Sequence, residues 1–190
     1  GRVGLALVDV GVGRFPVKTN SEAFAAVDKV EAYYKKNFNF SITDDESLCN
    51  TSSCYPQGDW RNWVAFIADD EDYQTHLTDA DALATKIKTN HPEFNIDKIY
   101  SDAFIQYSTP GGQRYYDVST GIDQRISKGC LVLNYTGHGG EVGLGHERYL
   151  EIGQIQSYTN KCNMPLFITA TCEFSRFDDP DRTSAGELCF

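Results

Sequence analysis

The sequence predicts an α/β fold with three layers and a mostly parallel sheet. Three continuous apolar runs, at residues 63–68, 130–135 and 165–170, are typical of strands that are covered on both faces. Segments with apolar residues at helical spacing separate these runs. Because strands alternate with helices, we expect right-handed crossovers that bring the strands into one parallel sheet.

The first expected helix precedes the sheet. Thr19 and Glu22 have the spacing of a capping box, and apolar residues at helical spacing follow as far as residues 37–39. The segment 41–59 is rich in Asp, Ser, Asn, Pro and Gly, which predicts a loop or a subdomain boundary.

Helices and strands are expected to alternate after the first apolar run. A proline and a glycine mark the ends of two of these helices. They are a helix that starts at 78–81 and stops at His91-Pro92, a strand at 96–104, a helix through Val118, Ile122 and Ile126 that Gly129 ends, and a weak helix near 151–159.

The composition excludes some classes of function. The formal net charge is -10, and such a surface repels phosphate backbones, so no nucleic-acid partner is expected. No apolar run reaches the roughly 18–20 residues that span a bilayer, and the start lacks the pattern of a signal peptide. Since the chain begins without Met and ends at Cys189-Phe190, we interpret it as a piece of a longer protein, so the lack of a targeting segment says nothing about location. We expect this piece to be weakly active or inactive by itself.

The six cysteines do not form a zinc ribbon, because no C-x-x-C pair occurs among them. Cys49 and Cys54 flank a polar loop, where they form a disulfide in an oxidising compartment or stay as two free thiols. Cys130 begins an apolar run and is expected in the core.

A histidine and a cysteine follow two of the predicted strands. His138 comes shortly after the run at 130–135, and Cys172 comes directly after the run at 165–170. Parallel sheets bind ligands beyond the carboxyl ends of their strands, so both side chains are expected at one functional edge. A nearby imidazole takes the proton of a thiol and produces the nucleophilic thiolate. The structural alternative is a histidine in a turn and a cysteine in the core.

The glycines around His138 suit a close approach of substrate to the backbone. The N–H groups of Gly139 and Cys172 are candidates for an oxyanion hole. Nucleotide binding is disfavoured, because this loop has neither G-x-G-x-x-G nor a Lys-Ser/Thr ending.

The acidic loop Asp69–Asp72 follows the first apolar run and leaves three interpretations open. One of its carboxylates orients the far nitrogen of His138. Several of them bind calcium, which prefers oxygen ligands, although the spacing is not that of an EF-hand. The third interpretation is a solvated loop without a ligand.

Two motifs carry a family resemblance. The string Asn134–Gly139, followed by Ala170–Cys172, resembles the gingipain family of cysteine peptidases, which have a caspase-like fold. Gly13–Val17 resembles the segment that joins the two gingipain subdomains. The resemblance implies a caspase/gingipain-like three-layer sandwich that is incomplete at both ends. It also implies that residues 1–57 are the end of the first subdomain with its linker, and that 58–190 are the N-terminal part of the catalytic subdomain.

The resemblance also implies the roles of the site residues. The catalytic pair falls on His138 and Cys172, and the oxyanion-hole amides fall on Gly139 and Cys172. The acid that orients the histidine falls on Glu71, with Asp70 as the second choice. No cofactor is required, and calcium is possible. Residues 76–79 show no secure counterpart of the acid that receives a basic P1 side chain in the gingipains.

Two longer strings, 139–148 and 169–180, resemble the branch of this family that acts as the sortase of type IX secretion in Bacteroidetes. This implies cleavage of C-terminal signal domains from secreted cargo through a thioester, and transfer of the cargo to a lipopolysaccharide-type amine. The partners would be secreted cargo and other type IX components, and the location would be the outer membrane, on the extracellular face of a Gram-negative cell. The alternatives are a plain secreted endopeptidase and a non-catalytic binding module on the same scaffold.

Overall fold

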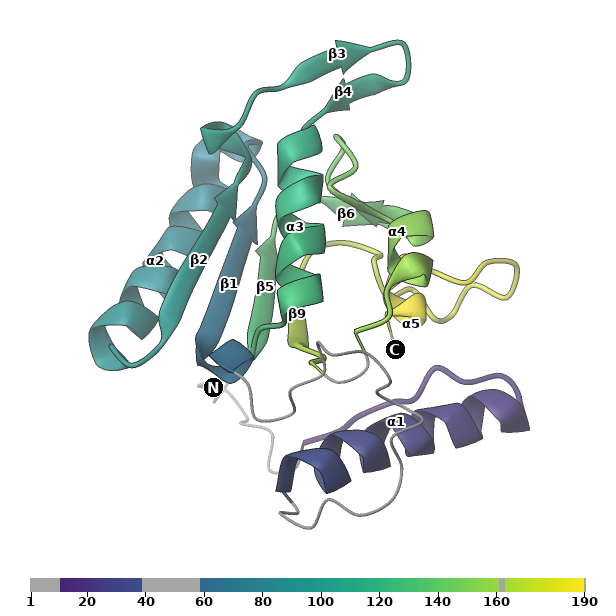
Figure 1. Cartoon of the computed structure of the whole chain (residues 1–190). Helices are drawn as coiled ribbons and strands as arrows, with labels where there is room; N and C mark the ends of the chain where they lie inside the picture. The colour runs from purple at the N-terminus through teal and green to yellow at the C-terminus, as the bar shows by residue number, and fades with distance from the viewer. Residues whose placement is uncertain (1–10, 39–58, 161–162, 190) are drawn as a thin grey trace, which may run out of the picture.

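The computed structural model describes residues 11–38, 59–160 and 163–189, and its centre is a parallel sheet with the strand order β2-β1-β5-β9 (Figure 1). The strands are β1 (Trp63–Ala68), β2 (Asn95–Tyr100), β5 (Val132–Thr136) and β9 (Leu166–Ala170). The three apolar runs therefore form three of the four strands, as the sequence predicted.

Helices cover both faces of this sheet. On one face, Ala80 and Ala84 of α2 (Thr75–Asn90) pack in one apolar cluster with Phe66 of β1. On the other face, Ile122 of α3 (Tyr116–Lys128) shares a second cluster with Ile67. Because side chains of a strand alternate between its two faces, β1 supplies both clusters. The predicted three-layer α/β architecture is confirmed.

Short elements connect this framework. They are the 3-10 turns η2 (Asp59–Asn62), η3 (Asp72–Gln74) and η4 (Ser101–Ala103), the hairpin β3 (Tyr107–Thr109) and β4 (Gly112–Arg114), the small antiparallel sheet β6 (Gly139–Gly140), β7 (Gly143–Leu144) and β8 (Leu150–Glu151), and the helices α4 (Ile152–Ser157) and α5 (Ala185–Leu188). The small sheet lies beyond the carboxyl ends of β5 and β9 and carries residues of the candidate site (Figure 1).

The N-terminal helix α1 (Asn20–Phe38) begins at the predicted capping box. The hydroxyl of Thr19 accepts the N–H of Glu22 at 3.2 Å, and the Glu22 carboxylate accepts the N–H of Thr19 at 3.0 Å. Lys29 of this helix donates to the carbonyl of Cys189 at 3.1 Å, so α1 contacts the C-terminal segment. The predicted subdomain boundary at 57/58 lies outside the described residues.

Two predicted boundaries are wrong. The second helix begins at Thr75 rather than at 78–81, because the Thr78 hydroxyl donates back to the carbonyl of Gln74 at 2.8 Å inside the helix instead of capping a start. The strand predicted at 96–104 ends at Tyr100. There the buried hydroxyl of Ser101 donates to the carbonyl of Ala68 at 3.1 Å and holds the chain in a 3-10 turn.

The predictions for the third helix, the weak helix and Cys130 are confirmed. Gly129 follows α3 with φ of 82°, a conformation that favours glycine, and its N–H donates to the carbonyl of Arg125 at 2.8 Å. The weak helix near 151–159 is α4. Cys130 is fully buried in the core, and burial raises the pKa of its thiol to about 12. Cys49 and Cys54 lie outside the described residues. Within the described ranges, no helix combines the length and the apolar character that crossing a membrane requires.

Candidate active site

The register of two neighbouring strands places the His138 and Cys172 loops side by side. Thr136 of β5 pairs with Ala170 of β9, and His138 and Cys172 each follow two residues later. The N–H of Gly137 donates to the carbonyl of Ala170 at 3.2 Å, which extends the contact into the two loops. Cys172 is exposed and its thiol is free. The structure thus brings the two predicted catalytic residues to one edge of the sheet.

The backbone of His138 is held on both sides. Its N–H donates to the carboxylate of Asp69 at 2.6 Å, and its carbonyl accepts the Tyr135 hydroxyl at 2.5 Å and the N–H of Gly145 at 2.8 Å. Gly137 is required here, since a Cβ at this position would lie 2.6 Å from both the Asp69 carboxylate and the Tyr135 hydroxyl. Asp69 is only 1% exposed, so its carboxylate is a fixed part of this support.

Two carboxylates of the acidic loop face the imidazole of His138. Its Nε2 lies 3.4 Å from Glu71 Oε2 and 3.1 Å from Asp72 Oδ2. Glu71 is the acid that the family resemblance pointed to, whereas Asp72 was not singled out from the sequence. Glu71 also accepts a hydrogen bond from His146 Nδ1 at 2.9 Å. The loop therefore places negative charge at one nitrogen of His138 and leaves the other nitrogen for a different partner.

Asp70, the second choice for the orienting acid, has a different set of partners. Its carboxylate accepts the hydroxyl of Tyr115 at 2.5 Å, that of Tyr149 at 3.2 Å and that of Ser101 at 3.4 Å. Burial and the bond to Asp70 raise the pKa of Tyr115. Asp70 thus links the end of β1 to three other segments, and among the described carboxylates it is Glu71 and Asp72 that contact the His138 ring.

Two more histidines surround His138, and neither was singled out as a site residue from the sequence. His146 stacks on it with ring centroids 5.1 Å apart and an interplanar angle of 10°. His76 meets it edge-on with centroids 5.0 Å apart, and Nδ1 of His76 lies 2.5 Å from Asp69 Oδ1. No helical spacing signals the Asp72–His76 contact, because Asp72 precedes α2 and residues 72–74 have positive φ, so the i, i+4 rule for helices does not apply to this pair.

The pKa of His146 is raised from its ordinary value. The hydrogen bond with Glu71 is the largest cause, and partial burial opposes it. Because the side chain of His146 is 69% exposed, solvent screens this pair and its contribution to stability is small. The contact with His146 mainly positions the Glu71 carboxylate, which also lies next to Nε2 of His138.

The backbone N–H of Gly139 is directed away from the small sheet. The N–H of Gly145 donates to the carbonyl of His138 at 2.8 Å, and Gly139 pairs with Leu144 in the next register position. Since hydrogen-bonded and non-hydrogen-bonded pairs alternate in an antiparallel ladder, Gly139 belongs to a non-hydrogen-bonded pair. A Cβ at Gly139 would overlap the Thr171 hydroxyl, so glycine allows the two loops to touch.

The Cys172 loop is fixed to the small sheet by charge and by packing. The nearly buried carboxylate of Glu141 accepts Arg176 at 2.8 Å and Arg182 at 3.0 Å. Phe174 is 3% exposed and packs in the core. Between Cys172 and Phe174, Glu173 adopts φ of 52°, which turns the chain sharply after the nucleophile candidate.

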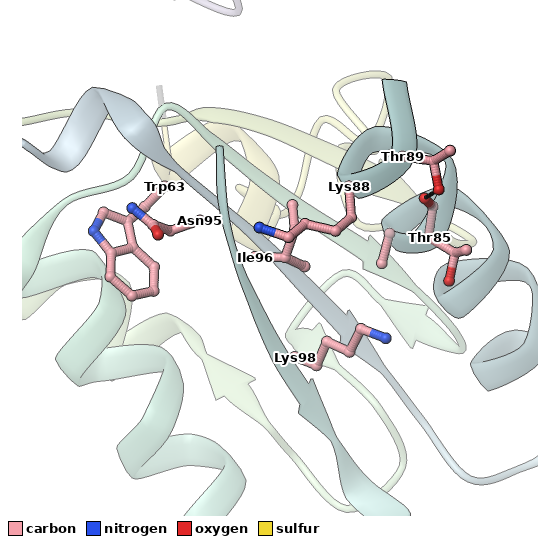
Figure 2. Close-up of a pocket in the computed structure, with 8 residues that line it drawn as sticks. Trp63, Thr85, Lys88, Thr89, Asn95, Ile96 and Lys98 are labelled. Carbon is pink, nitrogen blue, oxygen red and sulfur yellow. Dashed lines mark hydrogen bonds between the residues drawn. The ribbon is translucent and has the colours of Figure 1, made fainter. Parts of the chain in front are cut away.

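A pocket elsewhere on the molecule is not part of this site. Figure 2 shows its side chains, which come from the amino ends of β1 and β2 and from the C-terminal half of α2. The lining residues are Trp63, Ala84, Thr85, Lys88, Thr89, Asn95, Ile96 and Lys98. Because His138 and Cys172 follow the carboxyl ends of the strands, the pocket lies toward the opposite edge of the sheet.

Comparisons with known proteins identify the family and the fold. The family model described as Peptidase family C25 matches residues 4–190. The crystal structure of the Arg specific cysteine proteinase gingipain R (RGPB) aligns over 93% of this chain with a TM-score of 0.65 and 16% sequence identity. The chain spans 34% of that crystal chain, about a third of its length. No curated protein matches the sequence. At this identity the structural likeness shows the fold, and the predicted gingipain-like architecture is confirmed.

Proposed function

Because the chain belongs to peptidase family C25, we propose that it is the catalytic part of a cysteine peptidase, with Cys172 as the nucleophile and His138 as its base. The observation that carries this proposal is the register of β5 and β9, which sends both residues out of adjacent strand ends at the same level. An exposed free thiol next to a histidine loop is the arrangement that nucleophilic catalysis by cysteine requires.

The proposed reaction has two stages. Cys172 loses its proton to His138, and the thiolate sulfur attacks the carbonyl carbon of the peptide bond. The tetrahedral intermediate collapses to a thioester, and His138 gives the proton to the departing amine. Water or a second amine then attacks the thioester, its proton passes to His138, and the thiol of Cys172 is restored.

Glu71 and Asp72 support the base in this scheme. Their carboxylates lie 3.4 and 3.1 Å from Nε2 of His138, so they favour a proton on that nitrogen and leave Nδ1 to accept the thiol proton. They also stabilise the imidazolium that forms after the transfer. In this proposal the N–H groups of Gly139 and Cys172 stabilise the oxyanion, and the register that directs the Gly139 N–H away from the small sheet supports this role.

We further propose that the substrate is secreted cargo of type IX secretion, as for PorU, the sortase of that system. The strings 139–148 and 169–180 support this choice, because they resemble the sortase more closely than they resemble the Arg- and Lys-specific gingipains. In this proposal a lipopolysaccharide-type amine resolves the thioester at the outer face of the outer membrane, alongside other type IX components. Bound amines compete with water through their high effective concentration.

The test uses Cys172→Ala in the intact protein. This variant should fold, since Cys172 is exposed, and should leave the signal domains of cargo uncleaved. Unchanged processing would support a non-catalytic module instead. The mass of the processed cargo then separates the two enzymes: an amide-linked glycolipid indicates a sortase, and a free carboxylate indicates a plain endopeptidase.

A further inference from the structure

Three short distances link possible metal-ligand atoms of four side chains at the His138 imidazole. Nε2 of His138 lies 3.1 Å from Asp72 Oδ2 and 3.4 Å from Glu71 Oε2, and Nε2 of His76 lies 3.6 Å from the same Asp72 oxygen. In a tetrahedral zinc site with bonds of about 2.0–2.2 Å, ligand atoms lie about 3.3–3.6 Å apart. We call Glu71, Asp72, His76 and His138 the two-histidine cluster.

Asp69 prepares both imidazoles of this cluster. Its Oδ1 lies 2.5 Å from Nδ1 of His76, which fixes the proton on that nitrogen and leaves Nε2 with a free lone pair. Its Oδ2 accepts the backbone N–H of His138 at 2.6 Å and so fixes the second ligand through the main chain. Metal-binding histidines usually donate their other ring N–H to a carboxylate, which fixes the orientation of the ring. One donor atom each from Asp69, His76 and His138 lies within 4.8 Å of the others.

The donor set selects the class of metal. Two imidazole nitrogens and two carboxylate oxygens suit Zn²⁺ and related transition metals, whereas Ca²⁺ and Mg²⁺ take oxygen ligands. The cluster is also accessible from solvent, since the side chains of His76 and His138 are 19% and 33% exposed. An ion can therefore enter without local unfolding.

We propose that the two-histidine cluster binds one Zn²⁺ ion and that this ion inhibits the peptidase. Binding follows from the cluster alone. The inhibition rests on the proposed function, because an ion on His138 prevents that imidazole from accepting the proton of Cys172. The site thus makes the base available only when free zinc is scarce.

The experiment titrates the purified protein with Zn²⁺ in competition with a chromophoric chelator, which measures binding without turnover. We expect one ion per chain. His76→Gln should weaken binding at least tenfold, and Asp69→Asn should weaken it about 10- to 100-fold because the carboxylate no longer orients the His76 ring. The matched control is His91→Gln, since His91 is an exposed histidine at the end of α2 that pairs with Glu93 at 3.3 Å; it should bind as the wild type does.

Two results would overturn the binding site. One is unchanged affinity in folded His76→Gln; the other is loss of affinity in Cys172→Ala, which would place the ion on the thiol instead. Co²⁺ substitution in the wild type covers the case in which a variant fails to fold: tetrahedral d–d bands without a thiolate charge-transfer band are expected, and a thiolate band contradicts the site. If zinc binds to this cluster and turnover is unaffected, only the inhibition is wrong.

Discussion

The buried carboxylate of Asp69 accepts the backbone N–H of His138 at 2.6 Å. Asp69 is the first residue after β1, and His138 is the second residue after β5, so this bond ties together the ends of two adjacent strands. The same carboxylate contacts His76 on the helix that follows. One side chain therefore sets the position of the proposed base relative to the whole acidic loop.

Asp69→Asn should lower both stability and activity. The side-chain amide has a single oxygen, so it can accept only one of the two hydrogen bonds that the Asp69 carboxylate accepts. Its NH2 group then faces a second buried N–H donor, and this unsatisfied contact lowers the free energy of unfolding by about 1–3 kcal/mol. Urea denaturation should show this loss of unfolding free energy, and kcat should fall as His138 shifts. Asp59→Asn, at an exposed acid in η2, is the control and should change neither quantity. Wild-type stability and kcat in Asp69→Asn would show that the bond has no role.

Substitutions of Glu71 and Asp70 should have different effects: the first on the catalytic rate and the second on stability. Glu71→Gln removes a charge 3.4 Å from His138 Nε2 and should lower kcat by about 100-fold, the lower end of the range of general acid–base catalysis. Asp70→Asn disturbs three hydroxyl partners and should mainly lower the melting temperature. Steady-state rates and thermal denaturation of both variants decide the matter. The reverse pattern would make Asp70 the orienting acid.

The Glu71–His146 pair should be visible by NMR. The Glu71 carboxylate raises the pKa of His146, so the pair stabilises the fold below the unfolded-state pKa of about 6.5, and the contribution disappears as pH rises through the higher folded-state pKa. A titration of the His146 ring protons should give a midpoint above the ordinary histidine value of about 6.5. Glu71→Gln should bring the His146 midpoint back down. A midpoint that does not move in this variant would exclude the pair.

The ion pairs of Glu141 should hold the Cys172 loop in place. Glu141→Gln weakens the contacts with Arg176 and Arg182, and we expect a several-fold loss of kcat/KM with a small loss of stability. The exposed pair Lys98–Asp81 offers a control, because Asp81→Asn removes an ion pair between β2 and α2 that does not contact the Cys172 loop. Equal kinetic effects of the two variants would argue against a positioning role for Glu141.

The strong patterns in the sequence predicted the framework, because they depend on local spacing. The apolar run 63–68 and the i, i+4 series Val118, Ile122 and Ile126 became β1 and α3 as expected. The two-residue strands β6, β7 and β8 carry too little pattern to be predicted, since they depend on contacts between loops. The roles of Asp69 and His76 likewise depend on contacts with His138, which is distant from both in the sequence.

The sequence alone does not show which acid of the loop 69–72 contacts which group of the site. The sequence offers four consecutive acids at 69–72, and only the fold assigns one to the backbone of His138, one to a set of hydroxyls and two to the imidazole. The catalytic roles of His138 and Cys172, and the oxyanion role of Gly139, stay predictions that require kinetics.

The rate of alkylation of Cys172 by iodoacetamide at neutral pH, followed by peptide mapping in the wild type and in His138→Gln, tests the proposed pair without any knowledge of the substrate. Half-buried Cys189 is an internal reference, because burial raises the pKa of its thiol to about 12. If His138 activates the thiol, the rate at Cys172 falls at least tenfold in His138→Gln while the rate at Cys189 is unchanged. Equal rates at Cys172 in the two proteins would contradict a catalytic Cys172–His138 pair.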